Sequence, residues 1–303
     1  MFYSPLRYPG GKNKLACFIA KICSDNQING HYIEPYAGGA SVALFLLFQN
    51  IVDRITINDM DRSIYAFWYS VLNHCEELCE LIMKTEITIE NRQRCKEIQK
   101  EKETTDLLSL GFSTLFLNRT NRDGIIKGGV IGGKEQNGSY KLDCRFNKDE
   151  IIKKIEKIAS AKDRIKLYSL DALDLIDLIQ MESQNANTIF YFDPPYYLKG
   201  ASLYMNYYKT QDHSKVALKI KQIKCINWIV SYDNNDVIKN LYLPFLPKEY
   251  SFNHSAHSSK LGQEVLFFSE NLTYPSGLDW NPTEFKLSKK ANTKKIQYSP
   301  TLL

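Results

Sequence analysis

The chain has 303 residues, enough for two ordinary domains or for one large α/β domain with an insertion. Hydrophobic residues make up 44% and charged residues 24%, close to the globular average, so wholesale disorder, a collagen-like repeat and a coiled coil are excluded. The net charge of +5 permits a nucleic-acid partner but does not require one.

The N-terminal sequence MFYSPLRYPGGK has proline and glycine where a signal peptide has its apolar segment. The longest apolar run, Val42–Phe48, is much shorter than the ~20 residues of a membrane-spanning helix. We therefore expect a cytoplasmic protein without a membrane partner. The cysteines form no CxxC pair, and the pair His254 and His257 has no further ligand at metal-site spacing, so we expect reduced thiols and no metal.

The first regular elements form a strand–turn–helix–strand pattern. Tyr32–Pro35 forms the end of a strand, and Ala37–Ala40 is a tight glycine-rich turn. An apolar helix follows at Val42–Gln49, and a second strand, Ile55–Ile57, leads to Asp59. A glycine-rich turn between two such strands, with an acidic residue after the second, is typical of the nucleotide-binding half of a doubly wound sheet.

The middle of the chain is mainly helical and has one irregular stretch. Within residues 118–147, the five glycines between positions 124 and 133 are interleaved with Arg and Asn, which predicts a loop or irregular hairpin outside the sheet. Helices are expected over 62–106, 107–117 and 149–160. Strand-like runs follow at 165–168, 188–192, 228–230 and 265–268. The order predicts an α/β protein with a doubly wound sheet and a smaller, mainly helical insertion.

The most distinctive motif, Asp193-Pro194-Pro195-Tyr196, follows the strand at 188–192. Ligands of open α/β sheets bind at the carboxyl ends of the strands, so the motif faces the expected site. The prolines lack backbone donors, but their carbonyl groups remain acceptors beside a carboxylate and an aromatic ring. This combination suits a flat heterocycle that carries an amino group. The alternative is a proline turn with a core tyrosine.

This tetrapeptide resembles the catalytic motif of amino methyltransferases that use S-adenosylmethionine. Three further segments, Tyr8–Lys12, Glu34–Gly39 and Asn58–Asp61, resemble in chain order the cofactor motifs of Dam-like (class alpha) DNA adenine-N6 methyltransferases. The resemblance extends from about residue 4 to residue 271. It implies a Rossmann-like methyltransferase fold and a site-specific enzyme that flips adenine out of DNA and methylates its N6 amino group.

The resemblance also implies roles for single residues. Asp193 and the Pro194 carbonyl would accept hydrogen bonds from the adenine amino group, and the ring of Tyr196, rather than its hydroxyl, would stack on the base. Lys12 would reach either the methionine carboxylate of the cofactor or the catalytic carboxylate. The implied catalytic residues are Asp193, Pro194, Pro195 and Tyr196, and the implied cofactor-binding residues are Tyr8, Lys12, Glu34, Gly38, Asp59 and Asp193.

Two of these cofactor roles are more specific. Glu34 and Gly38 would lie beside the amino-acid moiety of S-adenosylmethionine. Asp59 lies about twenty positions after the glycine-rich turn, where an acidic residue binds ribose hydroxyls. The alternative for Asp59 is a helix N-cap.

Residues 116–148 carry a local charge of +4 and are expected to read DNA. The candidates for base or phosphate contact are Asn118, Arg119, Asn121 and Arg122. A solvated surface loop is the alternative. This segment departs from the pattern of the best-known relatives, so their recognition sequence does not carry over.

The expected organisation is a discontinuous catalytic domain, a recognition insertion and a basic tail. Their ranges are 1–61 with 150–273, 62–149, and 274–303. We expect a monomer that acts on double-stranded DNA, with a cognate restriction endonuclease encoded nearby as a further partner. The alternatives are an RNA or protein amide methyltransferase on the same fold, or a non-catalytic DNA-binding protein.

Overall fold

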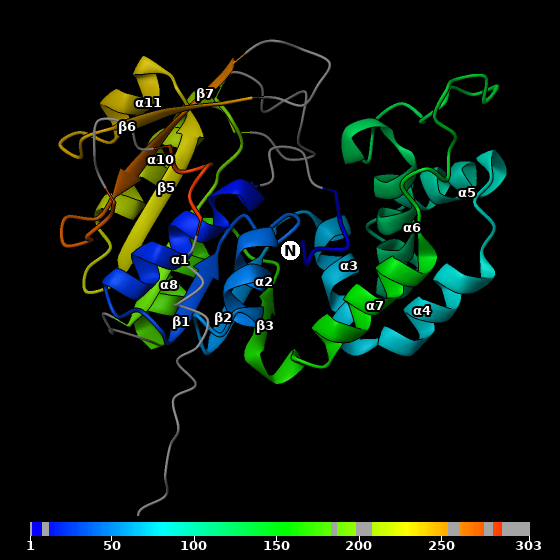
Figure 1. Ribbon diagram of the computed structural model, residues 1–303, viewed down its shortest axis with the longest axis horizontal. Coiled ribbons are helices and arrows are strands. Elements are labelled where there is room, and N and C mark those ends of the chain that lie inside the picture. Colours follow the sequence, from blue (N-terminus) through cyan, green and yellow to red (C-terminus); the bar gives the residue numbers. More distant parts are fainter. Residues whose placement is uncertain are drawn as a thin grey trace, which may run out of the picture.

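One β-sheet forms the centre of the computed structural model, which describes residues 2–7, 12–182, 187–197, 208–253, 261–275 and 281–286 (Figure 1). The strand order is β3-β2-β1-β4-β5-β7-β6. Neighbours from β3 to β5 pair in parallel, whereas β7 is antiparallel to both β5 and β6. The strands are β1 (His31–Glu34), β2 (Arg54–Asn58), β3 (Ile165–Tyr168), β4 (Thr188–Phe192), β5 (Asn227–Asp233), β6 (Lys248–Asn253) and β7 (Leu261–Phe268).

Helices connect the strands and cover both faces of the sheet (Figure 1). The α-helices are α1 (Ala16–Asp25), α2 (Ser41–Phe48), α3 (Arg62–Asn73), α4 (Cys75–Lys84), α5 (Ile89–Lys100), α6 (Leu107–Thr120), α7 (Lys148–Ala159), α8 (Ala172–Glu182), α10 (Thr210–Lys221) and α11 (Asp236–Leu241). Short 3-10 helices span Lys12–Leu15 (η1), Arg122–Gly124 (η2) and Lys162–Arg164 (η3). The predicted α/β doubly wound sheet is confirmed.

The burial of β4 explains why both faces need helices. Ile189 and Tyr191 belong to the core that contains α1 and α2, whereas Phe190 and Phe192 belong to a second core with α8 and α10. Successive side chains of a strand point to opposite faces, so a strand that is apolar throughout must be covered on both sides. In a sheet covered on both faces, polar side chains can therefore gather only at the ends of the strands.

Helices α3 to α7 form a group beside the sheet, at the right of Figure 1. Side-chain oxygens of Asp61, Thr88, Asp106 and Asn147 accept backbone N–H groups in the first turns of α3, α5, α6 and α7. The Thr88 cap divides the stretch 62–106, which the sequence predicted as helical, whereas the other three caps lie near the predicted helix starts. Helix α6 extends through Thr120, so the loop expected from residue 118 begins three residues later. The boundaries of a separate recognition domain stay a prediction.

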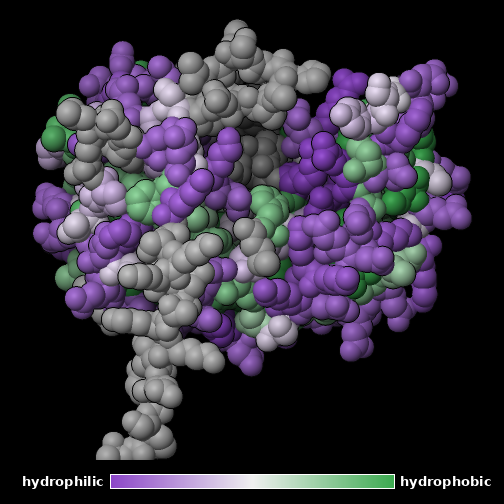
Figure 2. Space-filling view, viewed as in Figure 1, coloured by the Kyte–Doolittle hydropathy of each residue, from purple (hydrophilic) through white to green (hydrophobic). Residues whose placement is uncertain are grey.

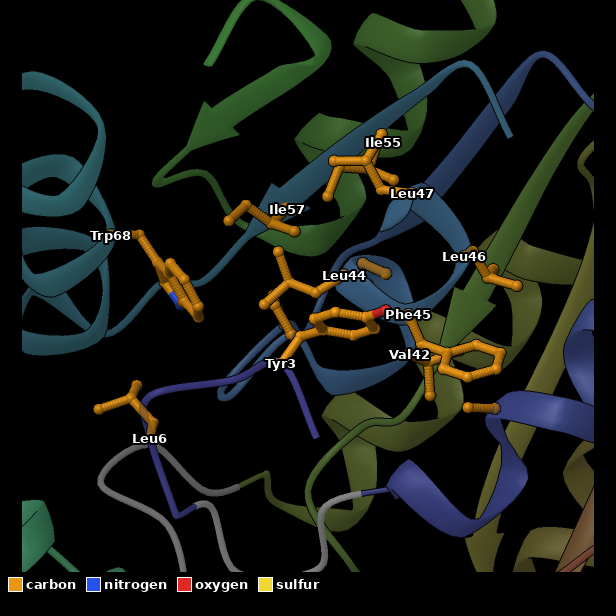
Figure 3. Close-up of a cluster of buried hydrophobic side chains, with 14 of the residues drawn as sticks. Tyr3, Leu6, Val42, Leu44, Phe45, Leu46, Leu47, Ile55, Ile57 and Trp68 are labelled. Atoms are coloured by element: carbon orange, nitrogen blue, oxygen red, sulfur yellow. The ribbon is translucent and has the colours of Figure 1, made fainter. Parts of the chain in front are cut away.

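The N-terminal segment joins the helical group to the sheet. Figure 3 shows Tyr3 and Leu6 beside apolar side chains of α2 and β2 and beside Trp68 of α3. The indole Nε1 of Trp68 donates a hydrogen bond to the Gly38 carbonyl at 2.8 Å. This contact fixes the position of α3 against the glycine-rich turn. Among the described residues, no helix is long and apolar enough to cross a membrane.

Candidate active site

The carboxyl ends of the parallel strands carry the polar side chains of the candidate site. Asn58, at the end of β2, ties three of these ends together. Its amide nitrogen donates to the carbonyls of Pro35 (2.9 Å) and Leu170 (3.0 Å), and its oxygen accepts from the Leu170 N–H at 2.8 Å. Because Pro35 follows β1 and Leu170 follows β3, one buried amide holds all three ends in register.

The glycine-rich turn is closed by Asp59. Gly38 adopts a positive φ of 45°, which glycine tolerates, and its N–H donates to Asp59 Oδ2 at 3.0 Å. Burial and the nearby charge of Asp61 raise the pKa of Asp59 to about 7, although backbone N–H groups oppose the shift. The N-cap of α3 is Asp61, which accepts from the Ser63 N–H at 2.8 Å. Asp59 is therefore held by the turn and does not serve as the cap.

Glu34 is buried at the end of β1. Its Oε1 accepts hydrogen bonds from the Tyr32 hydroxyl and from the Ala43 N–H, both at 3.0 Å. Burial raises the pKa of Glu34 to about 8, and the negative charge of Asp193 contributes to the rise. A cationic ligand at this edge of the sheet would relieve both effects, since a nearby positive charge favours ionised carboxylates.

Asp193 follows β4, and its Oδ1 atom has two partners. Ser231 Oγ of β5 donates to Oδ1 at 2.7 Å, and Lys12 Nζ lies 3.1 Å from the same oxygen. Burial raises the pKa of Asp193, although the Lys12 charge opposes the rise. No described residue bonds Oδ2 of this carboxylate, whose side chain is 19% exposed. That oxygen can therefore accept a hydrogen bond from a substrate.

Lys12 contacts Tyr196, the last residue of the motif, as well as Asp193. Lys12 Nζ donates to the Tyr196 hydroxyl at 2.9 Å and lies 4.8 Å from the centre of its ring. Burial alone would lower the pKa of Lys12, but the carboxylates of Asp193 and Glu264 raise it well above its usual value. Of the two sequence-based expectations for Lys12, its geometry matches contact with the catalytic carboxylate. Pro194 is buried and Pro195 is half-buried between Asp193 and Tyr196.

Sequence reasoning missed two side chains of this site, Ser231 and Glu264, and the core residue Tyr250, which contacts Glu264. Ser231 lies on β5, Tyr250 on β6 and Glu264 on β7. The strand expected at 265–268 begins at residue 261, and β6 was not predicted because its sequence is mostly polar. A glutamate directly before the apolar run Val265–Phe268 is the sequence signal that would have found Glu264. Tyr8, His254 and His257 lie outside the described residues, as do 276–280 and 287–303 of the expected tail.

Asn118 and Asn121 brace the expected recognition segment from inside. Asn118 accepts from the Arg7 N–H and donates to the Arg7 carbonyl, both at 2.8 Å. Asn121 accepts from Arg92 Nε at 2.8 Å and donates to the carbonyls of Ile125 and Ile126 at 3.0 and 2.8 Å. Both side chains are buried, an arrangement that speaks against direct base contact by either asparagine.

Arg7, Arg119 and Arg145 form what we call the arginine cluster. Arg119 Nη1 donates to the Arg145 carbonyl at 3.3 Å. Burial and the charges of Arg7 and Arg145 lower the pKa of Arg119 to about 10. Arg7 Nη1 and Arg119 Nε are buried and have no hydrogen-bond partner within the described part of the chain. Asp123 and Glu150 raise the pKa values of Arg7 and Arg119, but burial and mutual repulsion outweigh them, so the cluster favours a further anion.

The surface of the helical group is largely hydrophilic. Figure 2 shows hydrophilic side chains over much of this group, at the right of the view. Arg122 and Lys127 are exposed on the loop after α6. Within the described residues, no group of three or more His, Cys, Asp or Glu side chains could hold a metal ion.

Comparison with known proteins agrees with this geometry. Residues 8–254 match the family described as D12 class N6 adenine-specific DNA methyltransferase. A similar protein is the Type II methyltransferase M.MjaIII of Methanocaldococcus jannaschii, which is 25% identical over 207 residues that cover 63% of this chain and 68% of the relative. The resemblance inferred from the motifs is confirmed: the chain belongs to the D12 class of N6 adenine-specific DNA methyltransferases.

Proposed function

We propose that Asp193–Tyr196 and the carboxylates at the ends of β1 and β2 form the active site at which this adenine-specific DNA methyltransferase uses S-adenosylmethionine. The observation that carries this proposal is the convergence of Glu34, Asp59 and Asp193 at one edge of the sheet, each with a raised pKa. Ligands of open α/β sheets bind at that edge.

The charge of the site fits the cofactor. S-adenosylmethionine supplies a methyl group on a cationic sulfonium sulfur, and it carries a second positive charge on its amino group. Burial raises the pKa values of Glu34 and Asp193. Because their ionised forms are poorly solvated, these carboxylates would bind a cation more strongly than exposed carboxylates. Gly38 would let the backbone approach the ligand. Asp59 would accept hydrogen bonds from the ribose hydroxyls.

The catalytic motif would hold the target base. Adenine N6 is inaccessible inside a duplex, so the base must be flipped out at a cost of ~2–4 kcal/mol. Tyr196 would stack on the flipped ring. Oδ2 of Asp193 and the Pro194 carbonyl would accept hydrogen bonds from the amino group and turn its lone pair toward the methyl group. The nitrogen would take the methyl group as the methyl–sulfur bond breaks, which leaves a neutral thioether, and the cationic nitrogen would then release its proton to solvent. Positioning and electrostatics would therefore supply the rate.

The arginine cluster would bind DNA phosphates. The guanidinium groups of the half-buried Arg7 and Arg119, beside the exposed Arg145, suit the oxygens of a phosphodiester. Arg122 is exposed on the adjacent loop and is the better placed of the predicted residues to reach a base edge. Asn118 and Asn121 would act indirectly, by fixing the loop that presents Arg122.

The test is transfer of a labelled methyl group from S-adenosylmethionine to defined substrates. Wild-type protein should label double-stranded DNA at adenine, and neither RNA nor protein extract. Labelling of RNA or protein amide alone would contradict the proposed substrate. Cofactor binding without transfer would favour the non-catalytic alternative. A nearby restriction endonuclease, a monomeric state and a cytoplasmic location stay predictions.

A further inference from the structure

Glu264 contacts three polar side chains in the core next to the catalytic motif. Its side chain is 4% exposed. Lys12 Nζ lies 2.9 Å from Oε1, and the Tyr196 hydroxyl donates to the same oxygen. The Tyr250 hydroxyl donates to Oε2. Each oxygen of this buried carboxylate therefore has at least one donor, as a buried charge requires.

The antiparallel edge of the sheet delivers this carboxylate. Glu264 on β7 is paired in register with Tyr250 on β6 and lies next to β5. Strand β5 in turn is parallel to β4, from whose end the catalytic motif extends. A residue 68 positions after Tyr196 is thereby brought into hydrogen-bond contact with its hydroxyl. The far end of the aromatic ring is held from inside the sheet.

Lys12 lies between two carboxylates. Its Nζ is 3.1 Å from Asp193 Oδ1 and 2.9 Å from Glu264 Oε1. One cation thus serves two anions, so Lys12 neutralises Asp193 only in part. Tyr191 of β4 also faces this network, and its hydroxyl is hydrogen-bonded to Ser231 at 2.9 Å. The charge of Asp193 further acts on Glu34 of β1 and Tyr232 of β5. The charge of Glu264 raises the pKa of Asp193.

We propose that Glu264 is a positioning residue for methyl transfer, holding the Tyr196 hydroxyl and the Lys12 ammonium so that the ring and the Asp193 carboxylate keep the geometry the base requires. The proposal rests on the functions proposed above for Asp193 and Tyr196. Glu264 itself does not touch the base. It acts through Tyr196, which would stack on the base, and through Lys12, which contacts Asp193.

A purely structural role makes a different prediction. If Glu264 only neutralises Lys12 in the core, its replacement lowers thermal stability but leaves the pH dependence of the folded enzyme unchanged. If it positions the motif, replacement changes the rate of transfer and its pH profile while cofactor affinity stays nearly constant. The pH profile therefore separates the two roles.

The test compares Glu264→Gln and Glu264→Ala with Tyr250→Phe as the matched control. Tyr250→Phe removes a donor to Glu264 without touching Lys12 or Tyr196. Single-turnover methylation of duplex DNA should slow about 10-fold in Glu264→Gln and about 100-fold in Glu264→Ala, with cofactor Kd within about twofold of wild type. The control should keep about a third or more of the wild-type rate, because its loss reaches the motif only through the retained carboxylate.

The pH profile gives the second readout. Removing the negative charge of Glu264 lowers the pKa of Asp193, because that charge raises it. If the ionised carboxylate is the active form, the acid limb of the rate profile should move to lower pH in Glu264→Gln. An unmoved acid limb, or equal loss of rate in Glu264→Gln and Tyr250→Phe, would overturn the proposal.

Two outcomes need separate interpretation. If Glu264→Ala does not fold, Glu264→Gln decides, because the amide keeps the volume and an acceptor for Lys12 and Tyr196. Wild-type protein is assayed in parallel on the same duplex. Absence of adenine methylation by the wild type would contradict the proposed function, whereas wild-type activity in both Glu264 variants would contradict only the role of Glu264.

Discussion

Replacing Asp193 by alanine removes the acceptor that the structure presents to the base. The side chain is anchored through Oδ1, by Ser231 at 2.7 Å and Lys12 at 3.1 Å, so Oδ2 is held in a fixed direction. Loss of one preorganised polar contact in an active site costs ~10²–10³ in rate. In this variant Lys12 keeps Glu264 at 2.9 Å as a counter-charge, so the free energy of unfolding should fall by only ~1–3 kcal/mol.

Single-turnover transfer of a labelled methyl group to duplex DNA measures the rate, and calorimetric titration measures cofactor affinity. Asp193→Ala should lose far more rate than affinity. Asp163→Ala is a suitable control, because Asp163 is exposed and lies before the amino end of β3, whereas Asp193 follows the carboxyl end of β4. Near-wild-type methylation by Asp193→Ala would refute the reasoning about the acceptor.

Three further predictions concern other residues. Tyr196→Ala should lose ~1–3 kcal/mol of stacking on the flipped base. Tyr196→Phe, which sequence alone predicts to be mild, should slow transfer about 10-fold because the hydroxyl bonds Glu264, and wild-type rate in this variant would contradict that contact. Cofactor affinity, measured by calorimetry, should rise about 10-fold per pH unit below pH 8 and level off above it. The reason is that Glu34, with a pKa of about 8, must lose its proton to bind a cation, so Glu34→Gln should make the affinity nearly independent of pH. Arg7→Ala and Arg119→Ala should each reduce the slope of log affinity against log salt by about one unit, equally on cognate and scrambled duplexes, and unchanged slopes would move the phosphate contact elsewhere.

The sequence predicts the parts of the site that are local in the chain. Periodicity and turn residues place Glu34, Asp59 and Asp193 at strand ends, and parallel strands bring such ends to one edge. The structure agrees because β1, β2 and β4 pair in parallel. The choice between Asp59 and Asp61 as helix cap needed backbone geometry, since both precede α3 within a few residues.

Contacts between distant residues could not be predicted in this way. Glu264 lies 252 positions after Lys12, and only the antiparallel placement of β7 brings the two together. Asn118 and Asn121 look like base-reading residues in the sequence, because amide side chains also read base edges. Their burial against Arg7 and Arg92 reveals an internal bracing role that composition does not encode.

The central claim is that this site methylates adenine N6 in DNA at a defined sequence. Modification-sensitive sequencing of DNA from a host that expresses the wild-type protein tests it most directly, with Asp193→Ala expressed in parallel. We expect N6-methyladenine at one recurring sequence in the wild-type sample and none above background in the variant. Methylation that is absent, falls on cytosine, or persists unchanged in Asp193→Ala would contradict it.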